Sequence, residues 1–119
     1  MTLKIAIIGT RTIFVENMEK YLEVGCEEIV SGGAKGVDAQ AAAFAREKGI
    51  KLTEFLPDYS TYGRAAPIVR NRKIVEYADK IIAFWDGKSH GTEFVIKYAE
   101  KLGKSCMVVY CEEKNKTNP

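Results

Sequence analysis

Residues 31–38 read Ser-Gly-Gly-Ala-Lys-Gly-Val-Asp and lie between an apolar segment and an alanine-rich segment with helical spacing. Glycine allows positive φ angles and a close approach of the backbone to a ligand. The amide groups and dipole at a helix N-terminus favour an anion. The stretch therefore predicts a phosphate-binding loop, and a strand-to-helix turn without a ligand is the alternative. Its candidate binding residues are Ser31, Gly32, Gly33, Ala34, Lys35, Gly36 and Asp38.

A helix predicted over residues 66–77 carries an amide on its packing face. Its spacing assigns Ile68, Val75 and Ala78 to the side that packs on a sheet, and Asn71 falls on the same side. A buried amide needs hydrogen-bond partners. Asn71 is therefore either a core residue that ties neighbouring loops together or a side chain that faces a ligand.

Two arginines flank this asparagine and offer planar guanidinium groups suited to a phosphate. Arg70 and Arg72 are two residues apart, so helical spacing prevents both from facing one point. We take Arg70 as the ligand-binding candidate and Arg72 as a solvated charge. The periodicity is also compatible with the reverse assignment.

A third polar stretch, residues 86–93, joins an apolar segment to a helix. Thr92 is the predicted N-cap of this helix, and Glu93 suits the charge of its first turn. His90 is the only histidine of the chain and has no neighbouring carboxylate that would orient it as a general base. The candidate binding residues of the stretch are Lys88, Ser89, Gly91 and Thr92.

Strand-like and helix-like segments alternate along the chain, which is typical of α/β proteins. Strands are predicted over residues 4–8, 28–30, 50–56, 80–85 and 106–110, the third with the alternating pattern of an edge strand. Besides the helix over residues 66–77, three helices are expected. The first presents Phe14, Val15, Met18, Tyr21 and Leu22 on one face, the second packs through Val37, Ala41, Phe44 and Ala45 and ends near Gly49, and the last runs from Thr92 to Gly103.

Right-handed crossovers between these strands give a three-layer, Rossmann-like α/β fold. Its five-stranded sheet is mostly parallel, and the simplest strand order is 3-2-1-4-5. Ligands bind such sheets beyond the carboxyl ends of the strands. Residues 9–12, 31–38, 57–67 and 86–92 occupy those positions. The first of these loops adds Gly9, Thr10 and Arg11 to the candidate binding residues.

Composition limits the range of functions. The 119 residues, 46% of them hydrophobic, are sufficient for one core. A net charge of +2 argues against a broad nucleic-acid-binding surface. We expect one domain over residues 1–111 and a polar, flexible tail over residues 112–119.

Cysteine usage bears on the compartment and on metals. Cys26, Cys106 and Cys111 form no CxxC pair, and His90 has no cysteine partner at zinc-site spacing. Neither a disulfide framework nor a metal site is therefore predicted, and no cofactor is expected. A cytoplasmic protein is expected, because no apolar run has the length of a signal peptide core or a membrane span.

Two familiar phosphate motifs do not match. Residues 87–89 read Gly-Lys-Ser like the end of a P-loop, but Ile82 stands where its first glycine is required. Ser31 replaces the first glycine of a GxGxxG motif, and residues 9–14 after the first strand do not fit that motif either. An ordinary nicotinamide dehydrogenase is not expected.

The chain resembles the SLOG superfamily, the Rossmann-like group that includes the Smf/DprA DNA-processing proteins and the LOG phosphoribohydrolases. Residues 31–38 are similar to the SGGA(R/K)G(I/V)D signature of the Smf/DprA branch, and residues 70–72 to its arginine-asparagine pair. Residues 62–67, 83–89 and 91–92 look closest to small stand-alone YspA-related proteins. The resemblance covers nearly the whole chain and implies a nucleotide or nucleotide-derived ligand.

Departures from the better-known branches restrict what the resemblance implies. LOG enzymes carry PGGxGTxxE, whose glutamate assists cleavage of a ribosyl bond. Here Val95 holds the place of that glutamate, and Lys88 and Ser89 replace the paired glycines. DprA proteins bind single-stranded DNA with additional domains, which are not expected here because residues 1–111 form a single domain.

Three functions remain open. The first is binding or sensing of a phosphate-bearing nucleotide or nucleotide derivative. The second is hydrolysis of an N-glycosidic or related bond, which requires a carboxylate beside the oxocarbenium-like transition state. The third is binding of single-stranded nucleic acid, with stacking on Tyr59 and Tyr62. The weak catalytic candidates are Asp38, Asp86 and Glu93, and each is also explained as a capping or turn residue.

A homodimer is also open. Trp85 and the exposed parts of the first and fourth helices could form its interface. Packing of these apolar residues in the core of one chain is the alternative.

Overall fold

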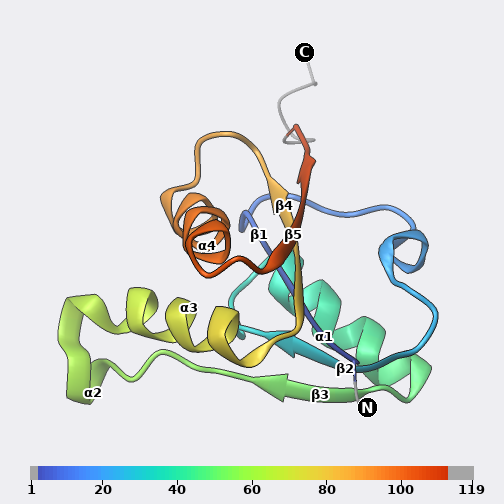
Figure 1. Cartoon of the computed structure of the whole chain (residues 1–119), viewed down its shortest axis with the longest axis horizontal. Coiled ribbons are helices and arrows are strands. Elements are labelled where there is room, and N and C mark those ends of the chain that lie inside the picture. The colour runs from blue at the N-terminus through green and yellow to red at the C-terminus, as the bar shows by residue number, and fades with distance from the viewer. Residues whose placement is uncertain (1–2, 113–119) are drawn as a thin grey trace.

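A computed structural model describes residues 3–112 of the chain (Figure 1). Its five strands form one parallel sheet in the order β3-β2-β1-β4-β5. The predicted α/β class and strand order are therefore confirmed. The strands are β1 (Leu3–Gly9), β2 (Cys26–Ser31), β3 (Lys51–Glu54), β4 (Lys80–Trp85) and β5 (Ser105–Tyr110). The helices are η1 (Met18–Tyr21), α1 (Val37–Lys48), α2 (Tyr59–Tyr62), η2 (Gly63–Ala65), α3 (Ala66–Tyr77) and α4 (His90–Lys101).

Helices cover the two faces of the sheet unequally (Figure 1). Alternate residues of a strand point to opposite faces. Ile5 and Ile7 of β1 accordingly pack with α1 and the segment around η1. Ala6 and Ile8 pack in a second cluster with α3 and α4. The central strand is thus buried on both sides, which explains its continuous apolar sequence.

The prediction of an amphipathic helix after β1 is wrong. Residues 13–17 lie outside any helix, and only η1 has helical turns. The amide of Val15 donates to Gln40 Oε1 at 2.9 Å, and the side-chain amide of Gln40 donates back to the Val15 carbonyl. Phe14, expected on the packing face, is 61% exposed. Alternate burial of Ile13 and Val15 shows that β-branched residues here follow an extended path.

The last helix begins earlier than predicted. Ser89 is the residue before the first turn of α4, so Thr92 lies inside the helix and is not its N-cap. Thr92 is buried, and its hydroxyl accepts a hydrogen bond from Ser89 Oγ at 3.4 Å. Serine and threonine are both common N-cap residues. Ser89 holds the N-cap position and Thr92 bonds to it from inside the helix, so the sequence alone did not distinguish the two.

The packing face of α3 is also different from the prediction. Ile74, Val75 and Ala78 are fully buried against the sheet, whereas Ile68 is 46% exposed. The second half of α3 therefore makes the core contact. This leaves the first half, including Asn71, next to the carboxyl edge of the sheet.

A single ammonium group caps the end of α3. Lys104 Nζ donates to the carbonyls of Val75 at 2.8 Å, Glu76 at 2.7 Å and Ala78 at 2.6 Å. The last carbonyls of a helix have no partners within it and carry a partial negative charge. Lys104, just before β5, thus fixes the turn between α3 and β4.

Lys104→Met is expected to lower the free energy of unfolding by about 1–3 kcal/mol, because three carbonyls lose a charged donor. Chemical denaturation followed by circular dichroism measures the change. Lys101→Met is the matched control, since Lys101 is an exposed lysine at the end of α4. Equal effects of the two substitutions would contradict the capping role.

A buried carboxylate joins β2, β3 and α3. Glu28 is 3% exposed, and its Oε2 accepts from Thr53 Oγ1 at 2.7 Å and from the Tyr77 hydroxyl at 2.6 Å. Burial alone would raise the pKa of Glu28. The hydrogen bonds from Tyr77 and Thr53, together with the charge of Lys51, outweigh this effect and lower the pKa below its ordinary value of 4.5.

Because the pKa of Glu28 is lower in the folded protein than in the unfolded chain, its ionised form stabilises the fold above pH 4.5, and this contribution is lost as the pH falls further. Glu28→Gln is expected to reduce stability at pH 7 and to make stability less dependent on pH below 4.5. Urea denaturation curves recorded at several pH values between pH 3 and 7 measure both effects. Parallel pH profiles for the two proteins would show that Glu28 does not contribute.

β5 forms one edge of the sheet and is poorly covered. Met107 is 50% exposed, Val108 43% and Tyr110 69%. Trp85 is half-buried, and its indole Nε1 donates to the Ser89 carbonyl at 3.0 Å. The homodimer stays a prediction.

Two further sequence expectations concern the ends of the chain and the membrane. Within residues 3–112, no helix has both the length and the apolar character needed to cross a bilayer. Of the tail expected over residues 112–119, residue 112 belongs to no helix or strand, and residues 113–119 lie outside the described residues.

Candidate functional site

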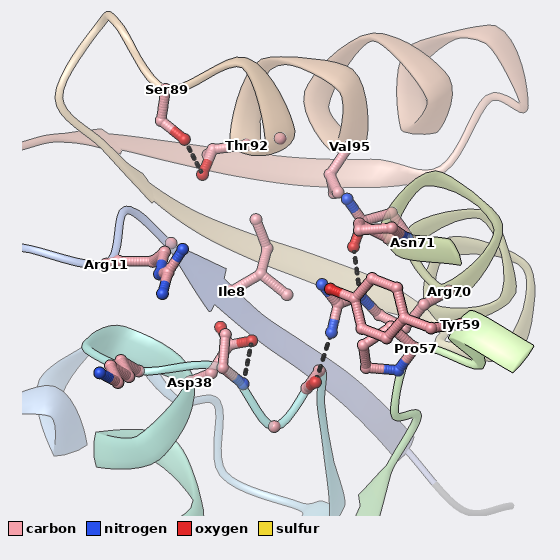
Figure 2. Close-up of a pocket in the computed structure, with 17 residues that line it drawn as sticks. Ile8, Arg11, Asp38, Pro57, Tyr59, Arg70, Asn71, Ser89, Thr92 and Val95 are labelled. Atoms are coloured by element: carbon pink, nitrogen blue, oxygen red, sulfur yellow. Dashed lines mark hydrogen bonds between the residues drawn. The ribbon is translucent and has the colours of Figure 1, made fainter. Parts of the chain in front are cut away.

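A cleft of about 490 Å³ lies at the carboxyl edge of the sheet (Figure 2). All four loops expected at this edge contribute to it. Its lining residues are Ile8, Gly9, Arg11, Gly32, Gly33, Ala34, Lys35, Asp38, Pro57, Tyr59, Pro67, Arg70, Asn71, Ser89, Gly91, Thr92 and Val95. Ile8 and Val95 supply apolar surface, and the polar groups surround it.

The glycine loop forms one wall of the cleft and is partly closed by its own side chains. The Gly33 amide donates to Ser31 Oγ at 3.3 Å, and the Ala34 amide donates to Asp38 Oδ2 at 3.3 Å. Gly33 has a φ of 71°, which glycine adopts without strain. The loop therefore has the predicted strand-to-helix geometry, but two of its amides already have acceptors within the chain.

Asp38 is a nearly buried carboxylate in this wall. It is 5% exposed, and it belongs to the first turn of α1. Burial raises the pKa of Asp38, and the Ala34 amide and the charge of Arg70 oppose that rise. Of the three catalytic candidates from the sequence, only Asp38 lines the cleft.

Two other glycines allow the first loop and α1 to touch. A Cβ on Gly9 would lie 2.7 Å from the Phe84 carbonyl oxygen and 2.7 Å from Val37 Cγ2. A Cβ on Gly36, whose φ is 74°, would lie 2.3 Å from the Arg11 carbonyl oxygen. Gly36 does not itself line the cleft. Because Gly36 has no Cβ, the backbone of Arg11 can lie directly against the glycine loop.

The opposite wall comes from α3 and holds Arg70 in a fixed position. Arg70 Nε donates to Asn71 Oδ1 at 2.8 Å, and its Nη1 donates to the Gly32 carbonyl (Figure 2). These bonds use two of the five guanidinium donors. Arg72 is exposed and does not line the cleft. The structure thus brings Arg70 to the predicted edge, and it gives Asn71 both a bonding role and a place in the lining.

The remaining carboxylate candidates do not line the cleft and have hydrogen-bond or ion-pair partners of their own. Asp86 Oδ1 accepts from the amides of Lys88 and Ser89, each at 2.8 Å, and from Thr10 Oγ1 at 3.3 Å. Burial alone would raise the pKa of Asp86, but these bonds lower it. Asp86 therefore shapes the loop before α4.

Glu93 points to its own helix and pairs with Lys97 at 3.1 Å. His90 Nδ1 lies 3.9 Å from a Glu93 oxygen, and the His90 side chain is 97% exposed. Neither residue lines the cleft. This geometry provides no enclosed acid-base pair at the start of α4.

The cleft contains most of the predicted binding residues and some that were missed. Thr10, Ser31, Gly36 and Lys88 lie outside the lining. Ile8 and Val95 were not anticipated, because apolar residues carry no chemical signal in a sequence. Pro57 and Pro67 were not named as binding residues, but they are the two ends of the 57–67 loop that was expected at this edge. Within residues 3–112, no group of three or more His, Cys, Asp or Glu side chains could hold a metal ion.

Comparisons with known proteins add no further constraint, because no protein-family model, curated protein or solved structure matches the chain. The fold and the cleft define an α/β protein of Rossmann-like architecture with a cleft at the carboxyl edge of the sheet.

Gly36→Ala is expected to lower the free energy of unfolding by roughly 2–4 kcal/mol, because a Cβ adds left-handed backbone strain and overlaps the Arg11 backbone. Gly49→Ala is the matched control, since Gly49 has a φ of 69° but open space around its Cβ position. The control should lose only about 1–2 kcal/mol. Urea denaturation measures both, and equal losses would show that the contact with Arg11 is unimportant.

Proposed function

We propose that this protein binds a phosphate-bearing nucleotide or nucleotide derivative in the cleft at the carboxyl edge of its sheet. The observation that carries the proposal is the convergence of three cationic side chains from three separate segments. Arg11 follows β1, Lys35 lies in the glycine loop and Arg70 lies on α3, and all three line the cleft.

Charge and shape both favour such a ligand. Three cations face one carboxylate in the lining, so the cleft attracts anions although the whole chain has a net charge of only +2. Arg70 has free donors in a planar group suited to a phosphate, and its bonds to Gly32 and Asn71 fix its orientation. The volume of about 490 Å³ falls within the range of small-molecule sites.

Aromatic and apolar surface completes the site. Tyr59 is 61% exposed, and it borders the cleft together with Pro57 and Pro67. An exposed ring next to a cationic cleft suits stacking with a nucleobase. The resemblance of residues 31–38 to the Smf/DprA signature of the SLOG superfamily also supports a nucleotide ligand.

Hydrolysis is the second candidate, and Asp38 is the observation that favours it. Asp38 is the one carboxylate among the lining residues, and cleavage of an N-glycosidic bond requires a carboxylate near the sugar. Chromatography of every binding mixture distinguishes the two functions. A released base would favour the hydrolase, and unchanged nucleotide would favour the binding or sensing protein.

Arg70→Gln is expected to weaken AMP binding by about tenfold or more, because a hydrogen bond to a charged group contributes roughly 1.5–3 kcal/mol and 1.4 kcal/mol corresponds to tenfold. Adenosine lacks the phosphate, so its affinity should change less than about threefold. Isothermal titration of both ligands measures the difference.

Arg72→Gln is the matched control, since Arg72 is an exposed arginine of the same helix. It should leave both affinities within about threefold of the wild-type values. Circular dichroism confirms that each variant is folded. Equal losses of AMP and adenosine binding in Arg70→Gln would indicate damaged packing and not a lost phosphate contact. Absence of binding by AMP, ADP, ADP-ribose and NAD to the wild-type protein would overturn the proposed function for these nucleotides.

A further inference from the structure

The cleft presents both signs of charge to whatever fills it. Arg11, Lys35 and Arg70 attract an anion, whereas Asp38 lies in the wall formed by the glycine loop and the start of α1 (Figure 2). A phosphate seated on this loop would lie beside a carboxylate in a poorly hydrated place, and like charges repel strongly there. The anionic part of a ligand is therefore better placed on the donors of the three cationic side chains than on the loop amides beside Asp38.

The part of the ligand near Asp38 must then donate hydrogen bonds. An ionised carboxylate only accepts them, and Asp38 is only 5% exposed. Its Oδ2 already accepts from the Ala34 amide. A ligand that covers this carboxylate without offering a donor would remove its remaining water without compensation. An apolar group or a second anion would both be unfavourable.

The carboxylate is also held in place. The Ser31 hydroxyl donates to the Asp38 backbone carbonyl at 3.3 Å, and the Ala34 amide holds Oδ2. A Cβ on Gly32 would lie 2.8 Å from Asp38 Oδ2 and 2.8 Å from Arg70 Nη1, so the carboxylate and the guanidinium lie close to one another over this glycine. The cleft thus holds a fixed acceptor and a fixed cationic donor next to each other at Gly32.

We propose, on the basis of the nucleotide-binding function proposed above, that Asp38 accepts hydrogen bonds from the ribose hydroxyls of the ligand. A nucleoside 5′-phosphate carries hydroxyl donors and an anion on the same sugar, so it supplies a donor for Asp38 and an anion for the cations of the same cleft. The cleft accordingly selects ribonucleotides over their deoxy counterparts. It also selects against DNA, which has no 2′-hydroxyl and whose internal 3′-oxygens are esterified.

Isothermal titration with AMP, 2′-deoxy-AMP, 3′-deoxy-AMP and 2′,3′-dideoxy-AMP tests this selection, because these ligands differ only in the sugar hydroxyls. The wild-type protein should bind dideoxy-AMP at least about tenfold more weakly than AMP, since a site built to bond a hydroxyl discriminates against ligands that lack it. Ribose 5-phosphate and 2-deoxyribose 5-phosphate repeat the comparison without the base.

Asp38→Asn assigns the selection to this side chain. Its amide oxygen can still accept from Ala34, but the charged acceptor facing the ligand is lost. The ratio of AMP to dideoxy-AMP affinity should fall to within about threefold of unity. Asp79→Asn is the matched control, because Asp79 also accepts a backbone amide, that of Lys4 at 2.8 Å, and lies outside the cleft. It should leave the ratio at its wild-type value.

The outcomes separate this inference from the function on which it rests. Equal binding of AMP and dideoxy-AMP by the wild-type protein would overturn the role of Asp38 and leave nucleotide binding intact. An unchanged ratio in Asp38→Asn would also overturn it. Absence of binding by every nucleotide would overturn both proposals. If Asp38→Asn does not fold, the wild-type comparison of AMP with 2′,3′-dideoxy-AMP still decides, because the dideoxy ligand lacks both ribose hydroxyls and equal affinities would contradict selection by these groups.

Discussion

The loop after β1 and the glycine loop before α1 approach each other so closely that a Cβ atom would not fit between them. The cleft depends on this contact. Gly9 ends β1 against the Phe84 carbonyl and Val37, and Gly36 precedes α1 against the Arg11 backbone. Because neither glycine carries a Cβ, the loop after β1 can lie directly on the glycine loop. This close approach brings Arg11 to the same cleft as Lys35 and Asp38. Gly36, one of the glycines predicted to bind phosphate, therefore serves to pack the two loops together.

The charges of the cleft follow from where each group finds its partners. Asp86 and Glu93 are fully engaged in a loop and in a helix, so neither faces the cleft. Asp38 remains there because its helix begins at the loop itself, where the Ala34 amide holds it. Arg70 approaches from α3 and bonds to the Gly32 carbonyl, which connects the two walls. A cleft with fixed donors and a fixed acceptor needs little reorganisation to bind a ligand with the matching pattern.

The sequence predicted most of the fold because the central strands β1 and β4 are buried on both faces. Short continuous apolar runs such as residues 81–85 are typical of central strands, and their alternation with helical segments favoured one simple topology. The same approach failed for residues 13–22, where apolar spacing suited a helix but Gln40, 25 residues from Val15, holds the backbone extended. A hydrogen bond between residues that are distant in sequence can override local periodicity, and it cannot be predicted from that periodicity. Ile68 was assigned to the core for a similar reason, since periodicity gives the face of a helix but not how far along its length the sheet extends.

For the site, the sequence by itself determined which residue types gather at one edge of the sheet. Loops that follow parallel strands must lie at the carboxyl edge, so Gly9, Gly32 and Ser89 were expected there from the sequence. Only the tertiary structure decided which side chains face the cleft. It selected Arg70 and not Arg72, retained Asp38 and excluded Asp86, and added the apolar surface of Ile8 and Val95. The physical reason is that chain order fixes the edge at which a loop lies, whereas the direction of a side chain depends on partners that are distant in sequence.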